Sequence, residues 1–244
     1  MIQSTENGLT PEDDQEQSLT SRSVRSFVVR NGRITPAQQR ALEQLFPRYG
    51  VVFKPELADW TEIFGRSGQL WVETGFGDGE ALLSMAGNHP EINFLGIEVH
   101  APGIGHLLHG VEKAGLTNVR VIRHDPVEVF EQMMAPQSIA KALVFFPDPW
   151  PKKRHHKRRI LQADFIALLA NRLQADGILH CATDWAPYAQ SMLELIGNNE
   201  DLLNTSEQNT YCERPEYRPL TKFEKRGKRL GHNVFDLIFA RKST

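Results

Sequence analysis

From Leu70 to Ala240, short apolar runs alternate with longer segments of mixed polar and apolar positions. The short runs predict buried strands, and the longer segments predict helices. Strands are predicted at 70–73, 93–98, 118–123, 141–146, 177–183 and 234–240, and helices at 79–87, 104–114, 126–134, 160–173 and 187–197. This alternation predicts an α/β fold, in which a mostly parallel sheet carries helices on both faces.

The chain that precedes this pattern has a different character. Residues 1–19 contain five acidic residues, no Lys or Arg and no apolar periodicity, so we expect a disordered acidic tail. Residues 20–50 form a basic extension, whose arginines suit either an ordered arm or a nucleic-acid contact. Within it, Thr35 and Pro36 predict the start of a helix that runs to about Phe46. The folded domain is expected over 51–244.

Several protein classes are excluded by composition. The 244 residues are 40% hydrophobic and 24% charged, as is usual for globular proteins. No run approaches the ~18 apolar residues of a membrane helix, and the polar N-terminus is not a signal peptide. Cys181 and Cys212 have no metal or disulfide spacing. We therefore expect a cytoplasmic protein with no membrane and no metal partner; monomer and homodimer both stay open.

The net charge of −2 conceals an uneven distribution of charge. Without the acidic tail the remaining chain is net positive, and its cations concentrate in residues 152–159 and 222–229. Such segments are typical of surfaces that bind polyanions. We expect the first segment to contact phosphates and the second to form another wall of the same channel. For 152–159 the alternative is a solvated, charged helix start.

The most informative stretch runs from Phe145 to Lys152 and leads directly into the first basic segment. An apolar strand ends there in a proline-rich turn that carries a carboxylate on Asp148 and an indole on Trp150. These two groups suit a flat ring that forms hydrogen bonds. With phosphate-binding residues beside it, the turn predicts chemistry on a nucleobase within a larger nucleic acid. For Trp150, burial in the core is an equal alternative.

Glycines and acidic residues mark the ends of the first predicted strands. Gly75 and Gly77 belong to a G-x-G-x-G turn, where glycines let a ligand approach the backbone. Glu80 stands where the dinucleotide fingerprint has its last glycine, which argues against a pyrophosphate ligand. The ends of three successive strands carry the acids Glu73, Glu98 and Asp125. They suit ribose hydroxyls, an adenine amino group or a sulfonium; capping of the following helices is the alternative.

Together these stretches resemble the bacterial tRNA (guanine-N7-)-methyltransferases, which have the Rossmann-like class I methyltransferase fold. The resemblance spans roughly residues 22–241 and is carried by 73–79, 96–105, 147–159, 183–185 and 221–224. The proline-rich turn with its basic continuation is the most specific part, together with the late Thr-Lys-Phe-Glu. Thr74 and Asp78 depart from the family, which more usually has apolar residues there.

The resemblance implies S-adenosylmethionine as cofactor, tRNA as partner, and methyl transfer to N7 of a guanine in the variable loop, at position 46 of the tRNA. It implies that Asp148 is catalytic and that the cofactor is bound by Glu73, Glu98, Asp125 and Asp148. The implied substrate-binding residues are Lys152, Asp184, Thr221, Lys222, Phe223 and Glu224. The implied RNA-binding residues are Arg154, His155, His156, Lys157, Arg158 and Arg159.

Three other functions stay open at this point. The sequence Asp148-Pro149-Trp150 is similar to the Asp/Asn-Pro-Pro-aromatic motif of amino-group methyltransferases, in which an acid grips an exocyclic nitrogen. A nicotinamide-dependent oxidoreductase has a similar topology, although the glycine spacing and the basic segment speak against it. A non-catalytic RNA-binding subunit would retain the fold, but it would not need Asp148 or the three strand-end acids.

Overall fold

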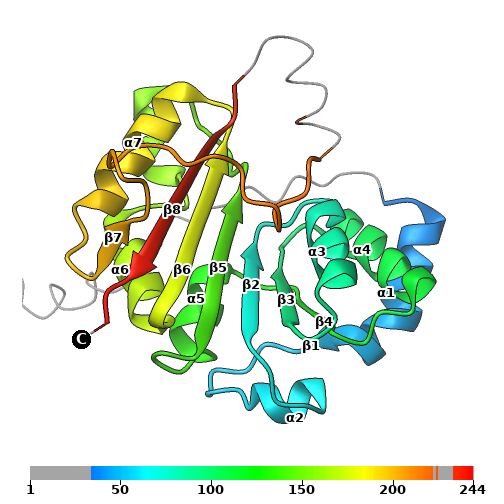
Figure 1. Cartoon of the computed structure of the whole chain (residues 1–244). Helices are drawn as coiled ribbons and strands as arrows, with labels where there is room; N and C mark the ends of the chain where they lie inside the picture. Colours follow the sequence, from blue (N-terminus) through cyan, green and yellow to red (C-terminus); the bar gives the residue numbers. More distant parts are fainter. Residues whose placement is uncertain (1–33, 222–223, 225–232, 244) are drawn as a thin grey trace, which may run out of the picture.

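The structure, a computed structural model, describes residues 34–221, 224 and 233–243. Within these residues, eight strands form one sheet in the order β1-β4-β3-β2-β5-β6-β8-β7 (Figure 1). The strands are β1 (Gly50–Val51), β2 (Leu70–Thr74), β3 (Asn93–Ile97), β4 (Val119–Ile122), β5 (Ile139–Phe145), β6 (Leu173–Thr183), β7 (Leu202–Asn204) and β8 (Phe235–Arg241). The helices are α1 (Pro36–Tyr49), α2 (Trp60–Phe64), α3 (Glu80–Asn88), α4 (Ala101–Ala114), α5 (Pro126–Gln132), α6 (Ala163–Arg172), α7 (Ala186–Gly197) and the 3₁₀ helix η1 (Lys153–Arg158).

The α/β architecture expected from the alternation is confirmed. Each strand and helix predicted beyond Leu70 is present, and β4, β3, β2, β5 and β6 pair in parallel. The last strand, β8, runs antiparallel to both β6 and β7. The pattern missed β1, α2, η1 and β7, since each is too short to show a period.

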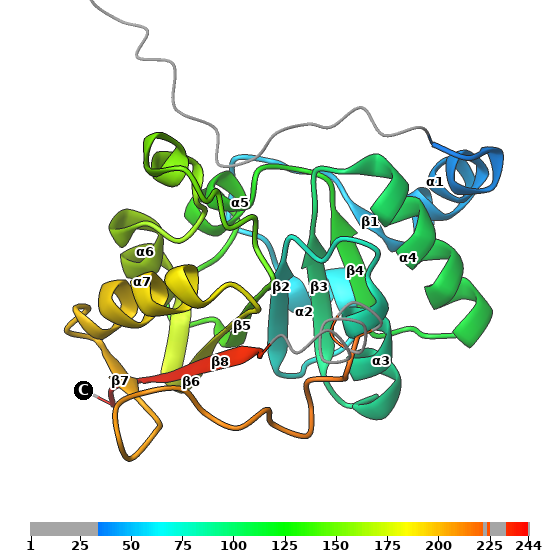
Figure 2. The ribbon, with the colours of Figure 1, turned by 90° about the horizontal axis from the view of Figure 1, so that it is seen from above.

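Both faces of the central strands β2 and β3 are buried. Leu70 and Val72 of β2 belong to the core that α5, α6 and α7 cover, whereas Trp71 belongs to the core under α1, α3 and α4. Figure 2 shows the two sets of helices on opposite sides of the sheet. Because successive strand residues face opposite sides, burial on both sides explains why the central strands are continuous apolar runs.

Helix α1 belongs to the body of the domain. Thr35 caps it, as expected, through a capping box with Gln38. The helix continues beyond its expected end to Tyr49, whose hydroxyl donates to Glu112 of α4 at 2.6 Å. A Cβ on Gly105 of α4 would lie 2.6 Å from the carbonyl oxygen of Gln38, so glycine permits the close approach of the two helices. The expected boundary at residue 51 therefore falls inside the fold.

The sheet has a topological switch point between β2 and β5. After β2 the chain builds β3 and β4 on one side, and it then crosses over to build β5 and β6 on the other. In sheets of this kind, ligands bind beyond the carboxyl ends of the strands at the switch point. The order of the strands therefore indicates where a site should be sought.

Some expectations fall outside the described residues. These are the acidic tail, the arginines of 20–33 and the basic segment 222–229 apart from Glu224. In the part of the chain that the structure describes, no helix is long and apolar enough to cross a membrane. That part also has no group of three or more His, Cys, Asp or Glu side chains placed to hold a metal ion.

Candidate active site

A cavity of about 370 Å³ opens at the switch point, beyond the carboxyl ends of β2, β3 and β5. This volume lies within the ~300–1,000 Å³ range of small-molecule sites. Its lining consists of Thr74, Gly75, Gly77, Ile97, Glu98, Val99, His100, Pro126, Val144, Phe146, Pro147, Asp148, Trp150 and Ile160. The glycine turn and the proline-rich turn, which are far apart in sequence, thus border the same cavity.

The glycine turn has a backbone that other residues adopt only with strain. Gly75 and Gly77 have φ values of +68° and +56°. A Cβ at either position would meet nothing within 4 Å, so backbone conformation, not space, requires glycine there. At Gly103 of α4, by contrast, a Cβ would lie 2.1 Å from the Gly77 carbonyl oxygen. The turn is therefore held tightly against α4, with its backbone at the cavity.

Glu98 joins the glycine turn to the end of β3. Its carboxylate accepts hydrogen bonds from the backbone N–H groups of Gly77 at 2.9 Å, Val99 at 2.8 Å and His100 at 3.0 Å. Glu98 is 9% exposed and lines the cavity. A carboxylate has about four lone-pair sites, so Glu98 can hold the turn and still accept a hydrogen bond from a ligand.

Two acceptor oxygens lie buried beside this turn. Burial, followed by the charge of Glu98, raises the pKa of Glu73 to about 8. Glu73 Oε2 and Thr74 Oγ1 have no hydrogen-bond partner among the described residues. Thr74 lines the cavity, whereas Glu73 lies behind the lining. A Thr hydroxyl both donates and accepts, so the unpartnered Thr74 Oγ1 favours a ligand that brings a hydrogen-bonding group to this side of the cavity.

The proline-rich turn is strained on both sides of Asp148. Phe146 and Trp150 have φ values of +51° and +43°, in the left-handed region that favours glycine. Such residues cost about 1–3 kcal/mol each and cluster at functional sites. A hydrogen bond of 2.7 Å from the Phe146 N–H to the Ala182 carbonyl anchors the start of the turn to β6. Asp148 is thereby held, exposed, at the cavity.

Comparison with known proteins shows the family to which the chain belongs. A family model described as "Putative methyltransferase" matches residues 67–237. A tRNA (guanine-N(7)-)-methyltransferase of Paraburkholderia xenovorans (strain LB400) is 50% identical over 93% of this chain and 86% of its own. The enzyme of that name from Shewanella amazonensis (strain ATCC BAA-1098 / SB2B) is 48% identical over 96% of this chain and 98% of its own. The chain belongs to the tRNA (guanine-N7-)-methyltransferase family.

Solved structures agree on the fold of this family member. The 16S rRNA methyltransferase KamB has a TM-score of 0.55 at 13% identity, covering 77% of this chain and 95% of KamB. The antibiotic-resistance methyltransferase Kmr has a TM-score of 0.51 at 13% identity, covering 78% of this chain and 98% of Kmr. The expected Rossmann-like class I methyltransferase fold is confirmed. Family membership also sets aside the oxidoreductase and amino-group methyltransferase alternatives.

The methyl donor of this methyltransferase is S-adenosylmethionine, and the cavity residues fit it. This cofactor carries an ammonium, a sulfonium and ribose hydroxyls, which match the unpartnered Thr74 Oγ1 and the carboxylate of Glu98. Asp125 caps α5 by accepting from the Val127 N–H at 2.9 Å, and it is not among the lining residues. Its neighbour Pro126 lines the cavity instead. Capping does not exclude a contact with the cofactor, so that expected role of Asp125 stays a prediction.

The expected RNA-binding segment has an exposed part, residues 152–158, and one buried residue, Arg159. Every residue from Lys152 to Arg158 is at least partly exposed. Arg159 is only 5% exposed; its Nε donates to the Pro149 carbonyl at 2.9 Å, and its guanidinium lies 4.4 Å from the centroid of the Tyr188 ring. This guanidinium therefore packs inside the protein and holds the proline-rich turn, and the expected contact of Arg159 with RNA stays a prediction.

The expected substrate-binding residues also include both exposed and buried side chains. Asp184 is exposed beyond the end of β6, and Thr221 Oγ1 accepts from the Glu224 N–H at 3.2 Å. Glu224 is 3% exposed, and both of its carboxylate oxygens accept from Arg218, at 2.7 and 3.2 Å. Glu224 thus forms an internal ion pair, and its expected contact with substrate stays a prediction. Lys222 and Phe223 lie outside the described residues.

Sequence reasoning missed a buried polar network behind the proline-rich turn. Arg218 also donates to Asp236 at 2.6 and 2.8 Å, and His180 Nε2 lies 2.8 Å from the same carboxylate. Burial opposes the ionisation of Asp236, but these hydrogen bonds hold its pKa below the usual value. Burial lowers the pKa of His180, so a neutral ring donates to Asp236 and accepts from the Tyr217 hydroxyl at 2.9 Å.

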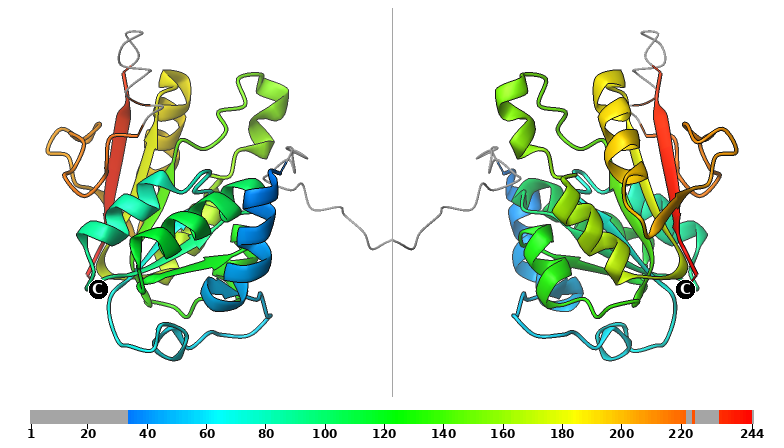
Figure 3. Two further views of the ribbon diagram at one scale, coloured as in Figure 1. Left: turned by 90° about the vertical axis from the view of Figure 1, so that its right-hand side faces the viewer. Right: turned by 90° about the vertical axis from the view of Figure 1, so that its left-hand side faces the viewer.

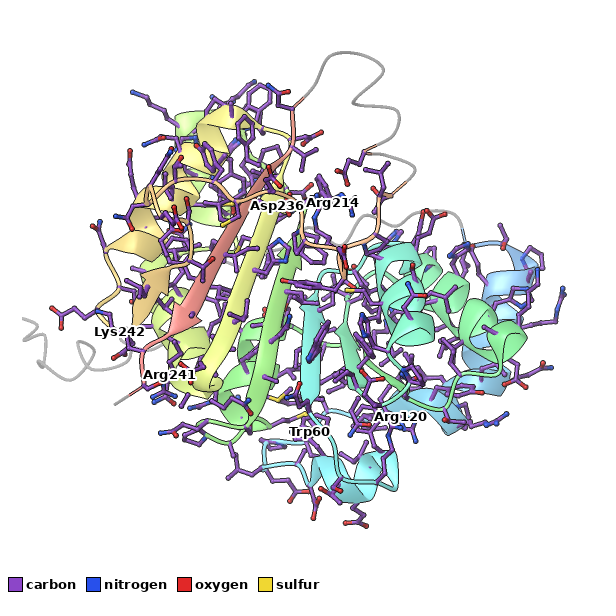
Figure 4. All side chains as sticks on the ribbon, viewed as in Figure 1. Trp60, Arg120, Arg214, Asp236, Arg241 and Lys242 are labelled. Atoms are coloured by element: carbon purple, nitrogen blue, oxygen red, sulfur yellow. The ribbon has the colours of Figure 1, made fainter. Side chains whose placement is uncertain are left out.

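This network fastens the segment before Thr221 to the sheet. Figure 4 shows Asp236 and Arg214 close together near one end of β8, where that segment crosses. The Arg218 guanidinium also lies 5.8 Å from the centroid of the Phe146 ring, which borders the cavity. A signal was present in the sequence: His180 and Asp236 interrupt apolar strands, where a titratable residue needs a buried partner.

Proposed function

We propose that this enzyme transfers a methyl group from S-adenosylmethionine to N7 of a guanine in the variable loop of tRNA, at position 46. The observation that carries the proposal is the continuity of the cavity with the basic helix η1. The last lining residues of the proline-rich turn, Asp148 and Trp150, lead directly into Lys152 and η1. A base whose phosphates lie on η1 can therefore reach the cavity.

The chemistry requires little of the protein beyond positioning. Guanine N7 has an exposed lone pair, so no general base is needed before it attacks the methyl group. The bound cofactor would supply that methyl group from its sulfonium: the S–CH3 bond breaks as the N7–CH3 bond forms, a neutral thioether is left, and the purine becomes positively charged. The carboxylate of Asp148, at the cavity, holds the purine in line and stabilises this developing charge.

The cofactor and the guanine make different demands on the side chains. Glu98 accepts from the ribose hydroxyls, while the backbone of Gly75 and Gly77 allows close approach. Asp184 is an exposed acceptor beyond β6 and suits the N1–H and 2-amino donors of guanine. The exposed position of Lys152 suits O6 or a phosphate.

The RNA backbone is assigned to the exposed part of the basic segment. Arg154, His155, His156, Lys157 and Arg158 present their side chains at the surface of η1. Phosphates bound there would offset the mutual repulsion of the Arg154, Lys157 and Arg158 cations. We also propose that the enzyme works in the cytoplasm, where tRNA is modified.

The test is methylation of unmodified tRNA with labelled S-adenosylmethionine, followed by nucleoside analysis. The expected product is N7-methylguanosine, and a tRNA with adenine in place of the variable-loop guanine should accept no label. A methyl group on an exocyclic nitrogen would refute the assigned target atom. Label that persists in the adenine-substituted tRNA would refute the assigned position.

Asp148 is tested in the same assay. Asp148→Ala and Asp148→Asn should each lower kcat by ~100–1,000-fold, a range typical for loss of one transition-state contact. Binding of tRNA in the absence of cofactor should stay near the wild-type value. Single-turnover rates near wild type in both variants would show that Asp148 only shapes the turn.

A further inference from the structure

An exposed tryptophan stands beside the proline-rich turn. Trp185 is 42% exposed, and it is the only aromatic among the exposed large hydrophobic side chains of the described residues. The others, Val52, Leu57 and Leu203, are aliphatic. An indole combines a large apolar face with a polar N–H, and tryptophans of this kind are enriched at binding interfaces.

The backbone that carries this indole is fixed. The N–H of Trp185 donates to Thr183 Oγ1 at 3.3 Å, and its carbonyl accepts from the N–H groups of Tyr188 at 2.9 Å and Ala189 at 3.0 Å. Thr183 is 1% exposed, and Tyr188 and Ala189 are completely buried. Trp185 thus forms the N-cap of α7 on a rigid support, with its ring exposed.

Trp185 lies next to the site because of the strand register. Phe145 of β5 pairs with Ala182 of β6, so the chain leaves β6 alongside the start of the proline-rich turn. Arg159 joins the proline-rich turn to α7, because it donates to the Pro149 carbonyl and packs on the ring of Tyr188. Figure 3 shows η1 and the start of α7 at the same end of the sheet. The proline-rich turn, η1 and Trp185 therefore lie at the same end of the sheet.

We infer that Trp185 is a stacking platform for an unpaired nucleobase of the RNA substrate, adjacent to the target guanine. This inference rests on the proposed function, which requires a base to leave its stack before it enters the cavity. A neighbouring base then loses its own stacking partner, and an exposed indole face replaces it. The exposed carboxylate of Asp184 repels phosphates at this point, so a base, not the backbone, faces the ring.

The first test compares Trp185→Ala, Trp185→Phe and the control Leu203→Ala. Leu203 is 57% exposed on β7, away from the cavity, so the control removes exposed apolar surface elsewhere. Trp185→Ala should weaken tRNA binding by about 5–150-fold without cofactor, as expected for one lost stacking contact. Trp185→Phe should recover most of this loss. Leu203→Ala should bind like wild type, and all three should keep wild-type S-adenosylmethionine affinity.

The second test identifies the nucleobase. Replacing one nucleotide beside the target guanine with an abasic ribose should weaken binding to wild type but cause no further loss with Trp185→Ala. Unchanged tRNA affinity in Trp185→Ala would overturn the inference. Losses that simply add would also overturn it, because the ring and the base would then act independently. Failure of the wild-type enzyme to methylate tRNA would instead refute the proposed function.

Discussion

The guanidinium of Arg218 grips the carboxylate of Glu224 with two hydrogen bonds, of 2.7 and 3.2 Å, inside the protein. Both side chains are 1% exposed. The same guanidinium binds Asp236, so one cation joins two carboxylates far apart in sequence. Because the Arg218 guanidinium lies near the Phe146 ring at the cavity, this ion pair links the segment around Thr221 to the active site.

Removing Arg218 should destabilise the fold. Arg218→Ala leaves two buried carboxylates without their cation, so we expect the free energy of unfolding to fall by about 3–5 kcal/mol. Urea unfolding measures this change. The matched control is Arg48→Ala, which breaks an exposed ion pair with Glu112 and should change stability by less than about 1 kcal/mol. Equal effects in the two variants would contradict the importance of the buried network.

Glu98 should matter for the cofactor in two ways. Glu98→Ala removes the acceptor proposed for the ribose hydroxyls and also frees the N–H of Gly77. We expect S-adenosylmethionine binding to weaken by about 10–150-fold in calorimetry. Glu98→Gln retains acceptor and shape, so its loss should be smaller. Affinity for tRNA without cofactor should hardly change; unaltered cofactor affinity in Glu98→Ala would reject the assignment.

Glu73 should make stability depend on pH. Its folded-state pKa of about 8 lies above the ordinary value of 4.5, so the folded protein binds the proton more tightly than the unfolded chain. The contribution of Glu73 to stability is therefore complete below about pH 4.5 and declines until about pH 8. Within this window the slope is on the order of 1 kcal/mol per pH unit.

The variant Glu73→Gln isolates this contribution. It cannot ionise, so its free energy of unfolding should fall less than that of wild type between pH 5 and pH 8. Urea unfolding in the absence of cofactor, at several pH values, gives the comparison. Parallel pH curves for the two proteins would show that Glu73 is already ionised in the folded state at pH 5.

Adjacent arginines of the basic segment should behave differently. Arg158 is partly exposed, so Arg158→Ala should weaken tRNA binding and reduce the slope of log affinity against log salt by about 1. Arg159→Ala should instead lower the melting temperature, because it removes the hydrogen bond to Pro149 and the packing on Tyr188. Filter binding across a salt series measures the effect on tRNA binding, and thermal unfolding measures the effect on stability. A loss of stability in Arg158→Ala and a loss of tRNA binding alone in Arg159→Ala would refute these two roles.

Local sequence determined the architecture and the location of the site. Apolar runs bounded by helices predict the sheet, because burial on both faces leaves few polar positions within a central strand. The glycines at 75 and 77 and the proline-rich turn around Asp148 are local signals too, since both depend on backbone conformation within a few residues. Their meeting at one cavity follows from parallel strands that end at the same edge.

Tertiary structure decided which charged side chains are free to act. Arg158 and Arg159 are equivalent cations in the sequence, yet the chain leaves η1 so that the first is exposed and the second is buried. Glu224 was expected to meet the substrate. In the structure it pairs with Arg218, which also binds Asp236, 18 residues after Arg218 in the sequence. Composition and spacing carry no information on burial. For a charged group, burial next to an opposite charge decides whether it binds a ligand or holds the fold.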